Sequence, residues 1–385
     1  MANDTKNTTK KWAGFGAALL VTLFAGAAHA QQTPGGSIGN GQNPMDRTDD
    51  GGQSEGSYNN DDRSLKYNAA ADDFNHKKYA EAATNLKEYL KNNAKDAQAH
   101  RLMADIDVAQ NNITAAIPEW ETAVQLDKKD KSSRANLGVA YMQTGAYTKA
   151  VTLYQDAAAH SPKDSQPEMQ LGMALDGGGK PAEAIAAFEK AAALNPKDGA
   201  PALYAGLLNH QTGHDDKAVP ELKTALALGT TQKFEAYTAL AAAASAAKQS
   251  VDAIKYTALA AQAQPDDFVS QANLGVLEQN AGNKADAEKA YEAAVALKFN
   301  DTKAMAGIQS NLALLLLDDG KLEEAAALLV KATQGDPANA LFQNNLGQVY
   351  EKQNKKEPAI AAYTKAVALD PGLTGAKDSL TRLKK

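Results

Sequence analysis

Two consecutive stretches of 34 residues decide the fold of this chain: KSSRANLGVAYMQTGAYTKAVTLYQDAAAHSPKD at residues 131–164 and SQPEMQLGMALDGGGKPAEAIAAFEKAAALNPKD at residues 165–198. When one is laid on the other, Leu137-Gly138 matches Leu171-Gly172, and Tyr154 matches Phe188. A later glycine, two alanines and a proline also recur 34 positions apart. This period is typical of repeats made of two amphipathic helices, neither of which buries its apolar face alone. The stretch therefore predicts an all-α chain of stacked helix pairs.

The same register extends over most of the chain. It divides residues 63–373 into nine units: 63–96, 97–130, 131–164, 165–198, 199–232, 234–267, 268–301, 306–339 and 340–373. Position 20 is Ala in every unit, and position 8 is always Gly or Ala. Small residues at fixed positions indicate close helix crossings, where a larger side chain would overpack the core. Residues 374–385 predict a C-terminal capping helix over the ninth unit.

This pattern resembles the tetratricopeptide repeat (TPR) family over residues 63–373. The resemblance implies a right-handed superhelical solenoid of nine TPR-like repeats. It also implies a non-catalytic protein–protein interaction scaffold, whose concave groove binds a peptide or a helical segment of a partner. In this family the first helix of each repeat lines the groove, with positions 2, 5, 6, 9, 12 and 13 directed toward it.

Position 6 of the repeat suggests how such a groove would bind. Asn occupies it in five units: Asn68, Asn136, Asn273, Asn311 and Asn345. A side-chain amide both donates and accepts, so a row of amides can pair with an extended peptide backbone. The alternative is that these are ordinary solvated groove residues. The carboxylate-clamp subtype of the family needs Lys and Arg along positions 2, 5 and 6, and because only Arg101 fits, that mode is disfavoured.

An apolar stretch of the expected groove lies in the third to fifth units. Its residues are Val139, Met142, Met169, Met173, Leu203, Tyr204 and Leu207. Such a surface would receive an apolar or amphipathic segment of a ligand, and methionine makes it adaptable. The alternative is that part of the stretch belongs to the core between repeats.

The N-terminal 62 residues differ from the repeats. Lys6, Lys10 and Lys11 precede an apolar run that ends at Ala28-His29-Ala30. This order predicts a signal peptide over residues 1–30 and an exported protein, in the periplasm or outside the cell, without stable membrane insertion after cleavage. The alternative is that the run is retained as a membrane anchor. Residues 31–62 are rich in Gly, Asn and Asp and predict a disordered acidic linker.

The residues that would carry other functions are few. The chain has no Cys, so neither a disulfide framework nor a thiolate metal site is expected. His210 and His214 are four residues apart, but Gly213 lies between them at a turn, so we assign no metal. Gly177-Gly178-Gly179-Lys180 follows no strand and does not match a phosphate-binding loop. We expect no cofactor and no enzymatic activity, because no nucleophile and base are paired.

Charge completes the functional prediction. Residues 63–385 carry 36 Lys and Arg against 39 Asp and Glu. Nucleic-acid binding needs a basic surface, so a nucleic-acid partner is not expected. The sequence therefore predicts a scaffold with a protein or peptide partner, in the assembly of envelope or secretion complexes. The alternative of another class is an accessory protein that holds polysaccharide during export or modification. The partner's identity and the oligomeric state are not indicated.

Overall fold

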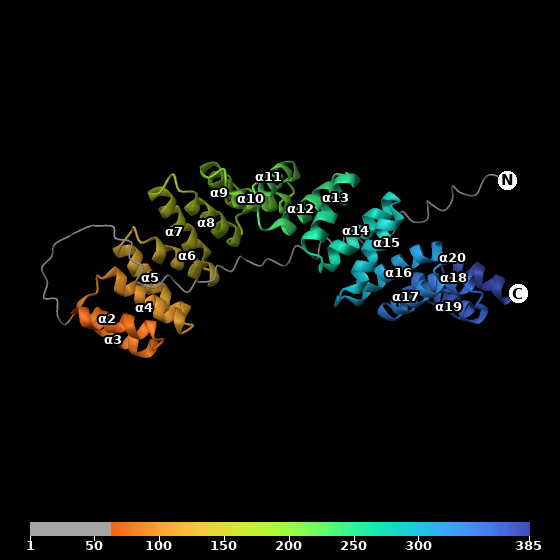
Figure 1. The fold of residues 1–385 in the computed structure, drawn as a ribbon, viewed down its shortest axis with the longest axis horizontal. Helices are drawn as coiled ribbons and strands as arrows, with labels where there is room; N and C mark the ends of the chain where they lie inside the picture. The colour runs from red at the N-terminus through yellow and green to blue at the C-terminus, as the bar shows by residue number, and fades with distance from the viewer. Residues whose placement is uncertain (1–62) are drawn as a thin grey trace. The chain divides into compact units, whose positions relative to one another are not determined.

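The computed structural model describes residues 63–385 and contains 19 helices and no strand in that range (Figure 1). This confirms the prediction of an all-α chain of helical repeats. The described chain divides into two compact units, residues 63–214 and residues 215–385. The predicted signal peptide and acidic linker lie outside the described residues.

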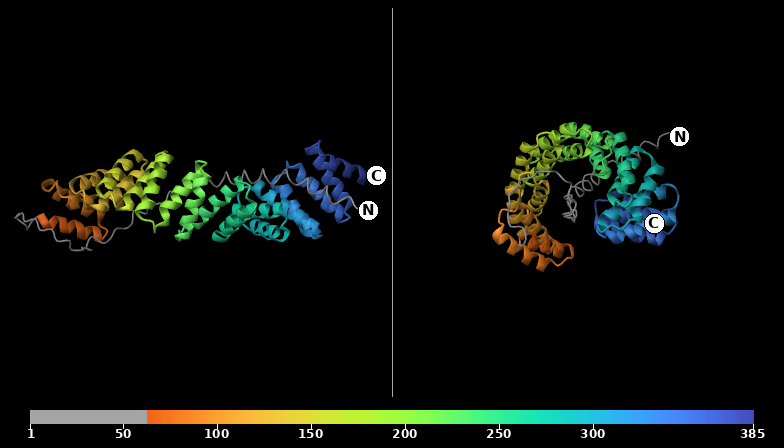
Figure 2. Two further views of the ribbon diagram at one scale, coloured as in Figure 1. Left: turned by 90° about the horizontal axis from the view of Figure 1, so that it is seen from above. Right: turned by 60° about the vertical axis from the view of Figure 1, so that its left-hand side comes forward.

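The unit of residues 63–214 contains nine of these helices. They are α2 (Arg63–Asn75), α3 (Tyr79–Asn92), α4 (Ala97–Ala109), α5 (Ile113–Leu126), α6 (Lys131–Gln143), α7 (Tyr147–His160), α8 (Ser165–Gly177), α9 (Pro181–Leu194) and α10 (Gly199–Gln211). Each packs against the next along the chain, as the views of Figure 2 also show. The even-numbered helices are the first helices of their repeats.

The unit of residues 215–385 contains the other ten. They are α11 (Asp215–Ala227), α12 (Lys233–Ala246), α13 (Ser250–Ala263), α14 (Phe268–Ala281), α15 (Lys284–Ala296), α16 (Thr302–Asp318), α17 (Leu322–Gly335), α18 (Ala340–Lys352), α19 (Lys356–Leu369) and α20 (Thr374–Lys384). Consecutive helices again pack together. At the end, Leu380 and Leu383 of α20 pack on Tyr363 and Ala366 of α19, while Ala376 is buried.

Helix starts are set by position 34, the residue just before each new repeat. Its side chain accepts a hydrogen bond from the first backbone N–H groups of the next first helix, which otherwise have no partner. The capping residues are Asp96, Asp130, Asp164, Asp198, Asp267, Asp301 and Asn339. Among the repeats after the first, the exception is α12, because its N-cap residue Gln232 makes no such bond.

The turn between the two helices of a repeat uses a left-handed residue at position 15. Glycine serves in five repeats, with φ from 72° to 84°: Gly145, Gly179, Gly213, Gly282 and Gly320. The other four repeats keep the same conformation with Lys77, Asn111, Lys248 and Asn354, at φ of 58° to 60°. The geometry of the repeat therefore imposes the left-handed turn even where the residue does not favour it.

The core explains the small residues of the sequence pattern. The nine alanines at position 20 are all fully buried or nearly so. Position 8 lies under the side chain of position 24 in the second helix. A Cβ added to Gly172 would lie 2.5 Å from Cε1 of Phe188, and Gly138, Gly275 and Gly347 face tyrosines in the same way. In these four repeats, glycine at position 8 leaves the space that the aromatic ring at position 24 occupies.

Candidate peptide-binding surface

Within residues 63–214, four successive first helices present half-buried side chains at repeat positions 9 and 12. We call this set the first-helix surface, and its members are Asp105, Val108, Val139, Met142, Met173, Asp176, Leu207 and His210. Val108, Met142 and Met173 also pack on one and the same hydrophobic core cluster. Because the core holds these three side chains on one side and leaves them partly exposed on the other, they offer apolar contact area that is already positioned.

The residues predicted from sequence divide into exposed and buried ones. Met142, Met173 and Leu207 are half-buried members of the first-helix surface. Met169 is 7% exposed and belongs to the core, so for this residue the alternative of inter-repeat packing describes the structure. Asn136 is half-buried on α6, whereas Asn68 is exposed on α2.

Tyr204 adds an aromatic side chain at position 6 of α10. It is half-buried, and its ring stacks on Phe188 at 5.6 Å between centroids. Phe188 is itself a buried residue of the second helix α9. The stacking fixes the direction of the Tyr204 ring, so this side chain enters a complex with little conformational entropy left to lose.

Arg101 is already engaged by the protein. Its Nη1 lies 3.8 Å from Oδ2 of Asp130, and that carboxylate also accepts from the backbone N (3.0 Å) and the hydroxyl (2.6 Å) of Ser133. The positive charge of the Arg101 guanidinium therefore lies near the negative charge of Asp130, the carboxylate that caps the start of α6. A ligand carboxylate would have to compete with Asp130 for this guanidinium.

Asp105 is a site residue that sequence reasoning missed. Burial raises its pKa to about 6, the charge of Asp130 acts in the same direction, and the charge of Arg101 lowers it. The indole N–H of Trp120 also lowers this pKa, although no hydrogen bond of ordinary geometry joins the two groups. Burial raises the pKa of Asp176 on α8 as well. The only available signal was an acidic residue at position 9, where the next three repeats have Val or Met or Leu.

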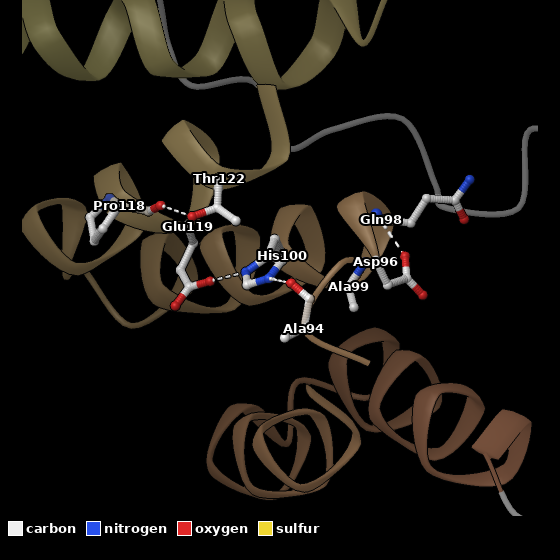
Figure 3. Close-up of polar contacts among 8 residues, drawn as sticks. All are labelled: Ala94, Asp96, Gln98, Ala99, His100, Pro118, Glu119 and Thr122. Atoms are coloured by element: carbon white, nitrogen blue, oxygen red, sulfur yellow. Dashed lines mark hydrogen bonds and ion pairs between the residues drawn. The ribbon is translucent and has the colours of Figure 1, made fainter. Parts of the chain in front are cut away.

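His100, at position 4 of α4, forms a polar junction between α4 and α5 (Figure 3). Its Nδ1 lies 2.6 Å from Oε2 of Glu119 on α5, and its Nε2 lies 3.1 Å from the carbonyl oxygen of Ala94. Both partners are hydrogen-bond acceptors, and they hold the ring between the turn before α4 and the helix α5. The pKa of Asp107 is raised mainly by burial and further by the nearby charge of Glu119. The junction connects the turn before α4 to the following helix.

The three later asparagines lie in the unit of residues 215–385. Asn311 Nδ2 donates to Oη of Tyr291 at 3.4 Å, and Asn345 Nδ2 donates to Oγ of Ser310 at 3.3 Å. Both are half-buried, so these amides are partly used by the protein's own hydroxyl groups. Asn273 is only 1% exposed, and its Oδ1 has no hydrogen-bond partner. A peptide ladder in this unit therefore has two accessible amides, on α16 and α18.

The repeat register is matched by a family model for the tetratricopeptide repeat over residues 101–165, 169–233, 272–332 and 310–374. Together these matches span more than half of the chain. The chain belongs to the tetratricopeptide repeat family. A comparison with curated proteins found no match.

Three solved structures illustrate what the chain resembles. YrrB, described as a TPR protein with an unusual peptide-binding site, is 23% identical, with a TM-score of 0.45 over 51% of this chain and 99% of that one. MamA from Desulfovibrio magneticus RS-1 is 20% identical, with a TM-score of 0.39 over 45% of this chain and 97% of that one. A structure of Naa15/Naa10 bound to HypK-THB gives 15% identity and a TM-score of 0.44 over 83% of this chain and 60% of that one.

In the part of the chain that the structure describes, no three His, Cys, Asp or Glu side chains gather as a metal site would require. In the same range, no helix combines the length and apolarity needed to cross a membrane. The first-helix surface combines apolar side chains with carboxylates of raised pKa, an arrangement suited to an apolar ligand segment that also carries basic residues.

Proposed function

We propose that this TPR protein is a non-catalytic interaction scaffold that binds an amphipathic, partly basic segment of a partner protein on the first-helix surface. One observation carries the proposal: Val139, Met142, Met173 and Leu207 are half-buried at positions 9 and 12 of three successive first helices, and the half-buried Asp105 and Asp176 occupy the same two repeat positions. Positions 9 and 12 are among those that the family resemblance directs toward the concave groove, and this supports the proposal.

The energetics favour a ligand with apolar anchors. Fully burying a Leu or Met side chain contributes about 1.5–3 kcal/mol, so a few anchors on this surface are enough for specific binding. The unbranched side chains of Met142 and Met173 adapt their shape to different anchors. A Lys or Arg of the ligand next to Asp105 or Asp176 would stabilise the carboxylate in its charged form. This pairing would also determine the position of the ligand segment along the surface.

The experiment is a crosslinking pull-down from native cells with two matched double variants. Met142→Glu combined with Leu207→Glu places charge on the first-helix surface. Thr152→Glu combined with Ala186→Glu places the same charge on exposed positions of α7 and α9. We expect the first pair to lose a captured partner that the second pair keeps, with both variants folded by circular dichroism. A partner that survives in the first pair would reject this surface.

The asparagine ladder is tested separately in the other unit. Asn311→Ala combined with Asn345→Ala removes the two half-buried amides and leaves the buried Asn273 in place. If the ladder holds the backbone of an extended peptide, this variant releases the partner while the Met142→Glu, Leu207→Glu pair keeps it. Recovery of bound oligosaccharide instead of protein in either experiment would favour the polysaccharide-holding alternative.

We also propose that the protein is exported and acts in the assembly of envelope or secretion complexes. The support is the basic residues, apolar run and Ala-His-Ala sequence within residues 1–30. Cell fractionation and N-terminal sequencing of the native protein test this. A mature chain beginning at Gln31 in the periplasmic or extracellular fraction supports it, and an intact Met1 in the cytoplasmic fraction contradicts it.

A further inference from the structure

A cavity of about 320 Å³ lies between α11, α12 and α13 in the unit of residues 215–385. These are the second helix of the fifth repeat and both helices of the sixth. Val219, Leu240, Ala243, Ala244 and Tyr256 contribute apolar surface to its lining. The volume falls at the small end of the range for ligand pockets, about 300–1,000 Å³.

The cavity arises from a difference between repeats at position 11. Elsewhere this position carries a larger side chain, and in three repeats it fills the space between helices as Tyr141, Leu175 or Leu316, all of them buried. Tyr141 reaches the preceding repeat, where its hydroxyl donates to Glu121. The sixth repeat has Ala244 at this position and Ala243 beside it. A methyl group cannot reach the preceding helix, so the space stays open.

The rim of the cavity is acidic. Asp215 and Asp216 at the start of α11 and Asp252 in the first turn of α13 contribute three carboxylates, against one ammonium group from Lys223. An acidic residue in a first helical turn is ordinary, and Asp286 occupies the same repeat position as Asp252 in the next repeat. What distinguishes the sixth repeat is the combination of these carboxylates with an apolar cavity. Val251, 82% exposed and adjacent to Asp252, adds apolar surface outside it.

We propose that this cavity is a second binding site, which takes an aliphatic or aromatic side chain of a partner peptide flanked by Lys or Arg. The apolar lining accepts the side chain, and the carboxylates of Asp216 and Asp252 pair with the flanking cations. Negative charge at the rim selects against acidic segments of the same apolar content. Because the site is formed by α11, α12 and α13, it does not depend on the first-helix surface of residues 63–214.

The test is a methyl NMR titration of the full chain with labelled alanine methyl groups. The probe is the capped tripeptide Arg-Leu-Arg, and the control peptides are capped Arg-Ser-Arg and Glu-Leu-Glu. We expect saturable shifts of the Ala243 and Ala244 methyl groups with Arg-Leu-Arg, and binding of each control weaker by about tenfold, since each lacks one of the two contributions. Equal shifts with all three peptides, or none with Arg-Leu-Arg, would overturn the proposal.

Two variants distinguish the contribution of the apolar cavity to peptide binding from that of its acidic rim. Ala244→Leu places at position 11 the residue that Leu175 and Leu316 have in other repeats, and it should reduce the affinity for Arg-Leu-Arg by about tenfold or more. Asp216→Asn combined with Asp252→Asn leaves the core intact and should remove most of the dependence of binding on ionic strength. Asp286→Asn is the matched control and should change nothing.

These outcomes are also separable from those of the first-helix surface. The Met142→Glu, Leu207→Glu variant keeps the binding of Arg-Leu-Arg at the cavity if the two sites are independent. Loss of cavity binding in that variant, or wild-type affinity in both Ala244→Leu and the Asp216, Asp252 double variant, would contradict the proposed site while leaving the scaffold proposal untouched.

Discussion

Replacing Asp105 by Asn should stabilise this protein at neutral pH. The carboxyl group of Asp105 has its pKa raised from 3.8 to about 6, first by burial and then by the charge of Asp130, with Arg101 acting against both. Asparagine has nearly the same shape and no charge. It therefore removes the unfavourable ionisation of a half-buried group and keeps an acceptor near the indole of Trp120.

The size and the pH range of the effect follow from the displaced pKa. Between pH 4 and pH 6 the folded state binds more protons at Asp105 than the unfolded state does, so the contribution of this residue to stability falls as the pH rises through that range. A displacement of roughly two units corresponds to at most about 3 kcal/mol, fully present above pH 6. Asp105→Asn should thus raise the free energy of unfolding by about 2–3 kcal/mol at pH 7 and leave it nearly unchanged at pH 4.

Denaturant unfolding of the full chain at pH 4, 5, 6 and 7 measures the change in the free energy of unfolding. Hydrogen exchange over residues 97–143 assigns that change to α4 and its neighbours. Glu189→Gln, an exposed carboxyl group on α9, is the control and should give no such pH dependence. A gain from Asp105→Asn that is equal at pH 4 and pH 7 would refute the ionisation argument. A loss at pH 7 would show that the carboxylate is stabilised by Arg101 more than burial opposes it.

Three further changes test the local rules of the repeat by thermal unfolding and hydrogen exchange. Lys248→Gly should stabilise by up to about 1 kcal/mol, because glycine adopts the left-handed turn without strain. Gln232→Asp should add about 0.5–1 kcal/mol by capping α12 as Asp267 caps α14. Gly172→Ala should destabilise by about 1–3 kcal/mol through its clash with Phe188. Adding Phe188→Leu should recover part of that loss, and if the double variant is no better than Gly172→Ala, the clash is not the cause.

The helical architecture could be predicted from the sequence because it depends on a repeated spacing. Alanine at position 20 and glycine or alanine at position 8 mark close crossings, and both sets are buried as such a role requires. The identity of the neighbour was not evident from spacing alone. That Gly138 lies under Tyr154 and Gly172 under Phe188 needs the crossing geometry of the two helices.

The site was less predictable, because exposure on a helix depends on what the neighbouring repeats place around it. Met169 and Met173 are both groove positions on α8, yet Met169 is in the core and Met173 is half-exposed. Asn273 and Asn345 share position 6, but only Asn273 is almost completely buried. Position within the repeat fixes the direction of a side chain, whereas accessibility depends on neighbouring side-chain volumes.

The sixth repeat departs from the pattern in several features that stabilise the others. Its first helix has no side-chain cap at Gln232, and Thr257 stands at position 24 with a buried hydroxyl group that has no partner. Its turn, like those of three other repeats, places a residue other than glycine, Lys248, in the left-handed region. Such departures from the pattern are expected either where stabilising residues have been lost without consequence or where a functional site is kept at the expense of stability. Substitutions that restore the stabilising residues distinguish these two explanations. Gln232→Asp and Lys248→Gly should stabilise the repeat and leave the cavity's affinity for the Arg-Leu-Arg peptide intact. Ala244→Leu should also stabilise the repeat but weaken that binding by about tenfold or more. If all three stabilise and the wild-type cavity binds none of the peptides, the repeat has only lost packing.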